Sequence, residues 1–227
     1  KRNLRRLCSV SKNIIVDTKE KYKIPDNFID LFQYRKKCDF DKESDGFLSV
    51  LDSANKETDV QKYIKDNKKW FIPGSIFRNY DFGNHCAFIT PEQKLGAEYI
   101  ADYMLLGKNS IGFQIVLVEF ENVNVSYKIS SANTESDSVR KGLTQIKDWK
   151  RWMDSNREYF LKSCGLEHLK ENIPSWGIHY CLVVSRRKLI DDTSNAMRGQ
   201  TQHETPGLTI ITYDRLVDKI KLLGNGF

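Results

Sequence analysis

The chain has 227 residues, of which 40% are hydrophobic and 29% are charged. This length allows one sizeable domain with a short additional arm, and the composition is globular rather than disordered or collagen-like. No apolar run approaches the ~18–20 residues that a membrane-spanning helix needs, so we expect no membrane partner.

Lysine and arginine outnumber aspartate and glutamate by 36 to 30, which gives a net charge of +6 at pH 7. The basic residues gather within residues 1–12, within residues 140–151 and at residues 186–188. Each cluster alone is typical of a solvated surface, but three in one chain favour a polyanionic partner. The cations that we expect to bind nucleic acid are Arg140, Lys141, Lys147, Arg186 and Arg187.

The five cysteines are scattered, form no C-x-x-C pair and are not accompanied by histidines at the spacing of a zinc site. A reduced, cytoplasmic protein is the simplest interpretation. The first residue is not methionine, so we expect the chain to be part of a longer protein. The motifs of P-loop nucleotide binding, of serine hydrolases and of zinc proteases are absent from the sequence.

Residues 1–52 are more polar than the rest, and we expect them to form an N-terminal arm or linker. Within this arm, apolar residues at 28–32 predict one helix, and the acidic stretch at 39–46 predicts a loop. Residues 53–227 are expected to form the main domain.

The main domain is predicted to begin with a helix that Ser53 caps and that runs to about Lys69. Val60 and Ile64 lie on its apolar stripe. Glu57 lies three residues before Val60, so we expect this carboxylate to face inward, which is an unusual position for a charged group.

An alternating pattern predicts a hairpin of two strands, residues 99–106 and 113–121, joined by a segment rich in turn-forming residues. The other predicted elements are irregular strands at 76–90, a short strand at 123–129, a long helix at 137–161, a strand at 178–185, a mobile polar loop at 192–206, a strand at 208–212 and a helix at 214–223. This order implies an α/β fold with a mixed central sheet flanked by helices.

Four carboxylates are expected at one end of this sheet. Asp102 lies in the first hairpin strand, and Glu119 lies near the end of the second. Glu121 is two residues further on, so it points to the same face as Glu119. If the two strands pair, Asp102 comes near Glu119, and the inward Glu57 joins them.

Carboxylates packed together repel one another and stay ionised if a divalent cation lies among them. Oxygen ligands without histidine or cysteine select a hard ion, so we expect Mg²⁺ or Mn²⁺, with Asp102, Glu119 and Glu57 as ligands. Such an ion can polarise a phosphodiester and generate a hydroxide nucleophile. The alternative is that Asp102 and Glu119 simply end their strands and pair with surface lysines or arginines.

Two polar residues lie on one face of the predicted long helix, which we expect to pack beside this cluster. Lys141 and Gln145 are one turn apart. Lys141 could contribute positive charge to a scissile phosphate, and Gln145 could hydrogen-bond a metal-bound water. For Trp149 and Trp152, core packing is the favoured interpretation.

This order of residues resembles the PD-(D/E)xK nuclease superfamily, which has a Glu on a helix, an Asp on one strand, a (D/E)xK motif on the next and a Gln on the following helix. The residues in these places are Glu57, Asp102, Glu119 with Glu121 two residues on, and Gln145. More closely, the sequence resembles the nuclease domain of the Shedu family of bacterial anti-phage defence proteins. That resemblance covers roughly residues 53–223 and is carried by the segments 57–61, 101–103, 117–121, 145–152, 179–187 and 212–216.

The resemblance implies a PD-(D/E)xK restriction-endonuclease-like core and metal-dependent cleavage of DNA in phage defence. It also implies a homo-oligomer in the bacterial cytoplasm, with an N-terminal regulatory region outside this chain. By this resemblance Asp102 and Glu119 bind the metal. Glu57 is a further ligand or orients a metal-bound water, and Gln145 supports the site.

One position departs from the superfamily pattern, because Glu121 occupies the place of its lysine. A lysine would stabilise developing negative charge, and glutamate has the wrong sign. Three outcomes are open. Glu121 binds the metal or a second ion while Lys141, Arg140 or Lys128 supplies the cation, or the domain binds nucleic acid without cutting it, or Glu121 has a different role. A third hypothesis is a protein-interaction domain with its tryptophans at a subunit interface.

Overall fold

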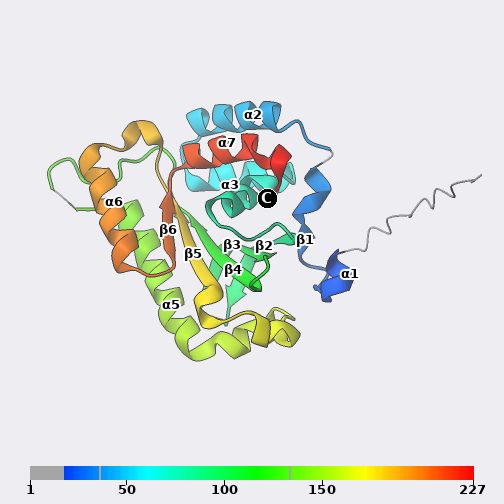
Figure 1. Cartoon of the computed structure of the whole chain (residues 1–227). Coiled ribbons are helices and arrows are strands. Elements are labelled where there is room, and N and C mark those ends of the chain that lie inside the picture. The colour runs from blue at the N-terminus through cyan, green and yellow to red at the C-terminus, as the bar shows by residue number, and fades with distance from the viewer. Residues whose placement is uncertain (1–17, 36, 133) are drawn as a thin grey trace, which may run out of the picture.

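The computed structural model describes residues 18–35, 37–132 and 134–227 (Figure 1). Within these residues, six strands form one sheet in the order β1-β2-β3-β4-β5-β6. Neighbouring strands from β1 to β4 run antiparallel, whereas β4, β5 and β6 run parallel. The strands are β1 (Ile29–Asp30), β2 (Cys86–Leu95), β3 (Tyr99–Lys108), β4 (Phe113–Phe120), β5 (Ile178–Val183) and β6 (Leu208–Ile211).

Helices cover both faces of the sheet (Figure 1). The long helix α5 (Asp137–Ser163) packs on one face, and α6 (Asp192–Glu204) lies beside it near β6. The other face carries α2 (Phe40–Ser53), α3 (Glu57–Asp66) and α7 (Tyr213–Lys221). The shorter helices are α1 (Thr18–Tyr22) and α4 (Phe71–Gly74), with 3₁₀ turns at 31–34, 75–79, 167–172, 175–177, 187–189 and 223–225.

Side-chain alternation along the strands builds two cores. In β3, Met104 and Leu106 pack into the core under α5, while Tyr103 and Leu105 pack into the core under α2, α3 and α7. Both cores are made of buried apolar side chains, so each face of the sheet is covered by apolar packing.

The predicted mixed sheet flanked by helices is confirmed, and so are the hairpin of β3 and β4, the long helix α5, the strands β5 and β6 and the final helix α7. The segment 123–129, predicted as a strand, is not one in the described structure. It contributes a single isolated bridge, between Lys128 and Glu135. The prediction of a mobile loop at 192–206 is also wrong, because this segment forms α6, which Asp191 caps through a bond from the Ser194 amide.

The region before residue 54 also differs from its prediction. Residues 39–46 begin helix α2 rather than a loop, and Asp39 caps that helix. Acidic residues in a first turn favour the positive end of the helix dipole, so the acidic run marks a helix start. Residues 28–32 form β1 and a 3₁₀ turn instead of a helix. Residues 18–52, expected as an arm, thus add a strand and a helix to the layers described above, and residues 1–17 lie outside the described residues.

The start of α3 is shifted as well. Ser53, predicted to cap it, is the last residue of α2, and α3 begins at Glu57. The carboxylate of Asp59 accepts bonds from the amides of Asn55 and Lys56, at 2.9 and 3.0 Å, and these bonds fix the new start. Glu57 therefore occupies the first turn, where a carboxylate is favoured.

Candidate functional site

Asp102 links β3 to β4 where their ladder ends. The last backbone pair is Tyr103 with Val118, and the next position in that register places Asp102 across from Glu119. Asp102 Oδ2 accepts a 2.7 Å hydrogen bond from the Phe120 amide. Burial raises the pKa of Asp102 to about 6, against the opposing effect of this amide bond.

Glu119 and Glu121 point to the α5 face of the sheet, on either side of Phe120, which packs into the opposite core. Their exposed fractions are 5% and 1%. Burial raises the pKa of Glu119 to about 10 and that of Glu121 to about 7, and neighbouring carboxylates add to both shifts. Glu119 Oε2 has no hydrogen-bond partner within the described part of the chain.

Two backbone bonds hold Glu121 in place. Its amide donates to the Val183 carbonyl at 2.9 Å, and its carbonyl accepts from the Tyr213 hydroxyl at 2.6 Å. The next residue, Asn122, donates to Ser138 Oγ at 2.9 Å and lies 3.4 Å from the Glu57 amide through its Oδ1 atom. The end of β4 is thereby tied to β5, α7, α5 and α3.

Lys141 of α5 supplies a cation to the cluster. Its Nζ atom lies 2.9 Å from Glu121 Oε1 and 3.9 Å from Glu57 Oε1. Burial lowers the pKa of Lys141, but its pairing with Glu121 leaves that pKa raised overall. The ammonium group is therefore charged at neutral pH.

Gly142 allows α5 to approach this closely. A Cβ atom built on Gly142 would lie 2.5 Å from Leu182 Cδ1 and 3.0 Å from Glu121 Cγ, which are distances that a real side chain does not tolerate without movement. Because Gly142 has no side chain, the first turns of α5 can lie close to the sheet, and Lys141 reaches the carboxylates.

Four carboxylates and one lysine therefore meet at this end of the sheet. Glu57, the first residue of α3, is about one quarter exposed, and its charge further raises the pKa of each of the other three acids. Such a set repels itself unless cations or protons balance it. The site can hold a proton at Glu119 or accept a hard cation in its place.

The donor chemistry of the site fits Mg²⁺ or Mn²⁺. Within residues 18–35, 37–132 and 134–227, no group of three or more His, Cys, Asp or Glu side chains stands ready to hold a metal ion. Mg²⁺, however, is commonly held by one or two carboxylates, with waters and substrate phosphates completing its coordination. Asp102 and the unpaired Glu119 oxygen supply this smaller set.

Two of the other residues predicted on α5, Arg140 and Gln145, line a groove beside the cluster. Gln145 is partly buried one turn beyond Lys141, and Arg140 pairs with Asp137. Both belong to a groove of about 710 Å³ that runs between α5 and residues 98–100 at the start of β3. Lys147 is exposed. Lys128, the remaining candidate for the missing cation, pairs with Asp191 at 3.0 Å, at the side of α6.

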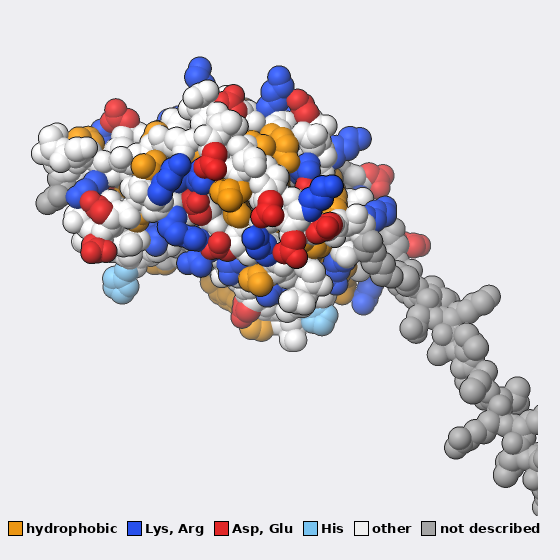
Figure 2. Space-filling view, turned by 90° about the horizontal axis from the view of Figure 1, so that it is seen from above, with side chains coloured by type: hydrophobic (Ala, Val, Ile, Leu, Met, Phe, Trp, Pro, Cys, Tyr) orange, Lys and Arg blue, Asp and Glu red, His pale blue; other side chains and the backbone are white. Residues whose placement is uncertain are grey.

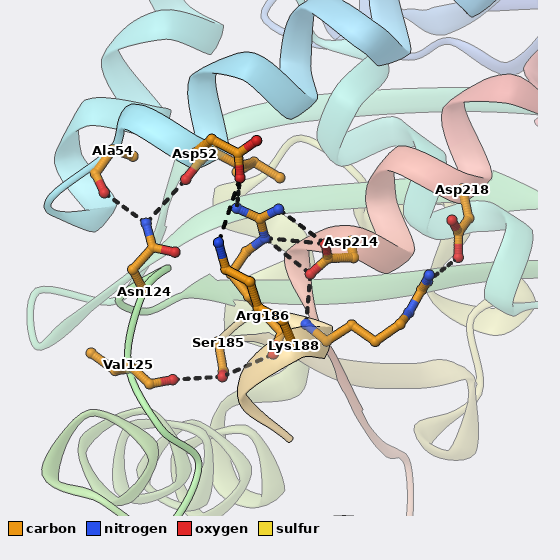
Figure 3. Close-up of polar contacts among 11 residues, drawn as sticks. Asp52, Ala54, Asn124, Val125, Ser185, Arg186, Lys188, Asp214 and Asp218 are labelled. Carbon is orange, nitrogen blue, oxygen red and sulfur yellow. Dashed lines mark hydrogen bonds and ion pairs between the residues drawn. The ribbon is translucent and has the colours of Figure 1, made fainter. Parts of the chain in front are cut away.

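Arg186 does not form the exposed basic cluster that its sequence neighbours suggest (Figure 3). It is 3% exposed and donates to both carboxylate oxygens of Asp214 and, at 3.0 Å, to Asp52. Arg187 pairs with Asp218, and Lys188 lies 3.7 Å from Asp52. The guanidinium of Arg186 is held in ion pairs within the chain. Its partners lie in α2 and α7, far away in sequence, so the local sequence does not reveal these pairs.

Three residues at the site have roles that sequence reasoning missed: Gln61, Asn122 and Gly142. Gln61 lies one turn after Glu57 on α3, and its amide favours the ionised form of Asp102. Its spacing of four residues from Glu57 was a usable signal. Asn122 and Gly142 act through contacts between elements that are distant in sequence, so the sequence carries no signal for their roles.

A comparison with protein-family models now bears on this site. The model described as Shedu protein SduA, C-terminal, matches residues 54–217. The chain belongs to the Shedu SduA C-terminal family. This family is associated with anti-phage defence. The matched region runs from just before α3 into α7 and contains all the site residues named above. A search of curated proteins gives no match. Among the described helices of this Shedu-family chain, none has the length and apolarity to cross a membrane.

Proposed function

We propose that this Shedu-family chain is a nuclease that hydrolyses DNA phosphodiesters with the help of Mg²⁺ or Mn²⁺, as part of anti-phage defence. The observation that carries the proposal is the meeting of Asp102, Glu119 and Glu121 with Lys141 at one end of the sheet. The proposal includes a PD-(D/E)xK type of core and a homo-oligomeric assembly in the bacterial cytoplasm.

Asp102 and Glu119 are the residues that would hold the ion, and Glu57 would bind it or orient one of its waters. When bound, the ion would polarise the phosphodiester and lower the pKa of an attacking water. The Phe120 amide fixes the orientation of Asp102. Gln145 in the α5 groove is positioned to hydrogen-bond a phosphate or a water beside the cluster.

Lys141 takes the part of the lysine that the superfamily carries at the position of Glu121. Its ammonium group reaches the same place from α5, 2.9 Å from Glu121. A positive charge there would stabilise the negative charge that develops on the phosphate oxygens. Arg140 and Lys128 are less suited, because each is paired with an aspartate away from the cluster.

Cleavage of linear and circular DNA by the purified chain, with Mg²⁺ or Mn²⁺, tests the proposal. Asp102→Asn and Glu119→Gln keep the size of each side chain and remove its charge, and each should lower the rate by at least about 100-fold. Lys141→Met should lower it by a comparable factor. Glu158→Gln, an exposed acid on the same helix α5, serves as the control and should leave the rate unchanged.

Cleavage that survives both Asp102→Asn and Glu119→Gln would disprove the proposed active site. Binding of DNA without any cleavage by the wild-type chain would instead favour the alternative of a nucleic-acid-binding module on a nuclease-like scaffold. That alternative draws on the replacement of the motif lysine by Glu121.

A further inference from the structure

A second, smaller pocket opens on the other side of Asp102, away from the α5 groove. It measures about 190 Å³ and lies between α3 and the strands β2 and β3. It is lined by Thr58, Gln61, Lys62, Lys65, Trp70, Pro91, Glu92, Asp102 and Tyr103. Asp102 therefore belongs both to the carboxylate cluster and to the wall of this pocket.

The pocket exists because β2 breaks its pairing with β3 at this point. Pro91 pairs with Tyr103 and Gln93 with Ala101, and between them Glu92 lies across from Asp102. Glu92 has a φ of 52°, in the left-handed region that glutamate rarely adopts. Residues held in such conformations concentrate at binding and active sites. The backbone thus opens the sheet directly opposite Asp102.

This part of β2 is also accessible from the edge of the sheet. Within the described residues, β1 pairs with β2 through Ile29 and Asp30 alone, opposite Ile89 and Phe88. Trp70, the residue before helix α4, lines the pocket together with Pro91 and Glu92 of β2. The pocket brings this part of β2 and Asp102 of β3 into one lining.

The lining combines three kinds of group that meet in sites for single bases. Trp70 is partly buried and offers an aromatic surface, with Pro91 and Tyr103 as apolar neighbours. Gln61 and Thr58 offer an amide and a hydroxyl. Lys62 and Lys65 are exposed at the rim, where Lys65 pairs with Glu92 at 2.7 Å. Aromatic stacking, amide hydrogen bonds and flanking cations are how proteins bind unstacked nucleotides.

The size of the pocket limits the ligand. Sites for whole drug-sized ligands measure about 300–1,000 Å³, so a pocket of about 190 Å³ accommodates a single ring system rather than a complete nucleotide. We propose that it binds one unstacked nucleobase of the DNA strand, stacked on Trp70, with the adjoining phosphates at Lys62 and Lys65 on its rim. This inference rests on the proposed nuclease function.

The test is a binding experiment in EDTA, so that it does not depend on cleavage. The probe is a single-stranded oligodeoxynucleotide with 5-iododeoxyuridine at one position, which on irradiation crosslinks to an aromatic residue that the base contacts. We expect a crosslink at Trp70. Trp70→Leu should remove this crosslink and weaken binding by about 5- to 150-fold, the span expected for one stacked base.

Two further variants separate base binding from general effects. Trp176→Leu, which removes an exposed tryptophan near the opposite end of the sheet, is the control and should change neither readout. If Trp70→Leu lowers the melting temperature markedly, Lys62→Ala replaces it. Lys62→Ala should weaken binding and reduce the slope of log affinity against log salt by about 0.7, whereas Lys162→Ala at the far end of α5 should not.

Crosslinks elsewhere, together with unchanged affinity in Trp70→Leu, would overturn the base-binding pocket while leaving the nuclease proposal intact. A crosslink at Trp70 in a chain that does not cleave DNA with Mg²⁺ would support the pocket and disprove the nuclease. Absence of any binding at low salt in EDTA would overturn the base-binding pocket, whereas the nuclease proposal is decided by the cleavage test with Mg²⁺ or Mn²⁺.

Discussion

Glu119 is the residue on which the electrostatics of the site depend most. It is 5% exposed, its Oε2 atom is unpaired in the described structure, and two neighbouring acids lie close by. A buried polar atom without a partner costs about 1–3 kcal/mol of folding free energy. The chain therefore retains a group that destabilises it, as active sites commonly do.

This cost predicts how stability depends on pH. Burial raises the pKa of Glu119 from its usual 4.5 to about 10, so between these values the folded chain binds more protons than the unfolded chain. The free energy of unfolding must then fall as pH rises through this window. In EDTA at pH 8, Glu119→Gln should increase it by about 1–3 kcal/mol and flatten its pH dependence.

Urea unfolding at several pH values measures this effect, with Glu158→Gln as the control. A Glu119→Gln variant that is less stable than the wild type at pH 8, or that keeps the same pH dependence, would contradict the burial of an unpaired acid at this position.

The residue types of the site could be predicted from the sequence, whereas several of their contacts could not. Glu57, Asp102, Glu119 and Glu121 stood out as charged residues next to apolar patterns. The place of Lys141 depends on Gly142, because the close approach of α5 to β4 sets its reach. That approach is a tertiary effect with no local signature.

At the scale of elements, Arg186 joins pieces of the fold that surround the site (Figure 3). It follows β5 and pairs with Asp52 near the end of α2 and with Asp214 in the first turn of α7. The preceding residue, Ser185, has a φ of 65° and donates to the Val125 carbonyl at 2.6 Å. The segment after β5 is thus fixed against the loop that follows Glu121.

Removal of this guanidinium should destabilise the fold rather than DNA binding alone. Arg186→Met leaves Asp214, whose side chain is 17% exposed, without its partner, and breaking a buried pair costs about 3–5 kcal/mol. The pair with Asp52, which is 56% exposed, adds at most about 1 kcal/mol. Lys188→Met, next to it but exposed, should cost at most about 1 kcal/mol. Urea unfolding measures both, and equal, small effects would show that Arg186 is not a structural link.

Elements with strong apolar patterns were the ones that the sequence predicted well. β4 is buried at every position, and α5 carries a regular apolar stripe. α6 was missed because its sequence is polar, with Ser194 as its one fully buried residue within the described helix. The acidic first turn of α2 is typical of a loop as well as of a helix start, so its sequence does not by itself predict a helix.

At the scale of the whole molecule, the arrangement of charged side chains differs between the two sides of the sheet. The face that α2 and α7 form carries acidic and basic side chains side by side (Figure 2). The α5 side combines the carboxylate cluster with a groove that holds Arg140, Lys141 and Gln145. The groove is also lined by Glu98, Asp137 and Asp148, so Arg140 and Lys141 do not make it a basic surface.

Binding of Mn²⁺, followed by the electron paramagnetic resonance signal of the free ion, tests the central claim most directly. The account predicts that the wild-type chain removes Mn²⁺ from solution and that Asp102→Asn and Glu119→Gln each abolish this binding, while Glu158→Gln does not. Binding that is equally strong in the wild type and in both site variants, or absent from the wild type, would contradict a metal site at the end of β4.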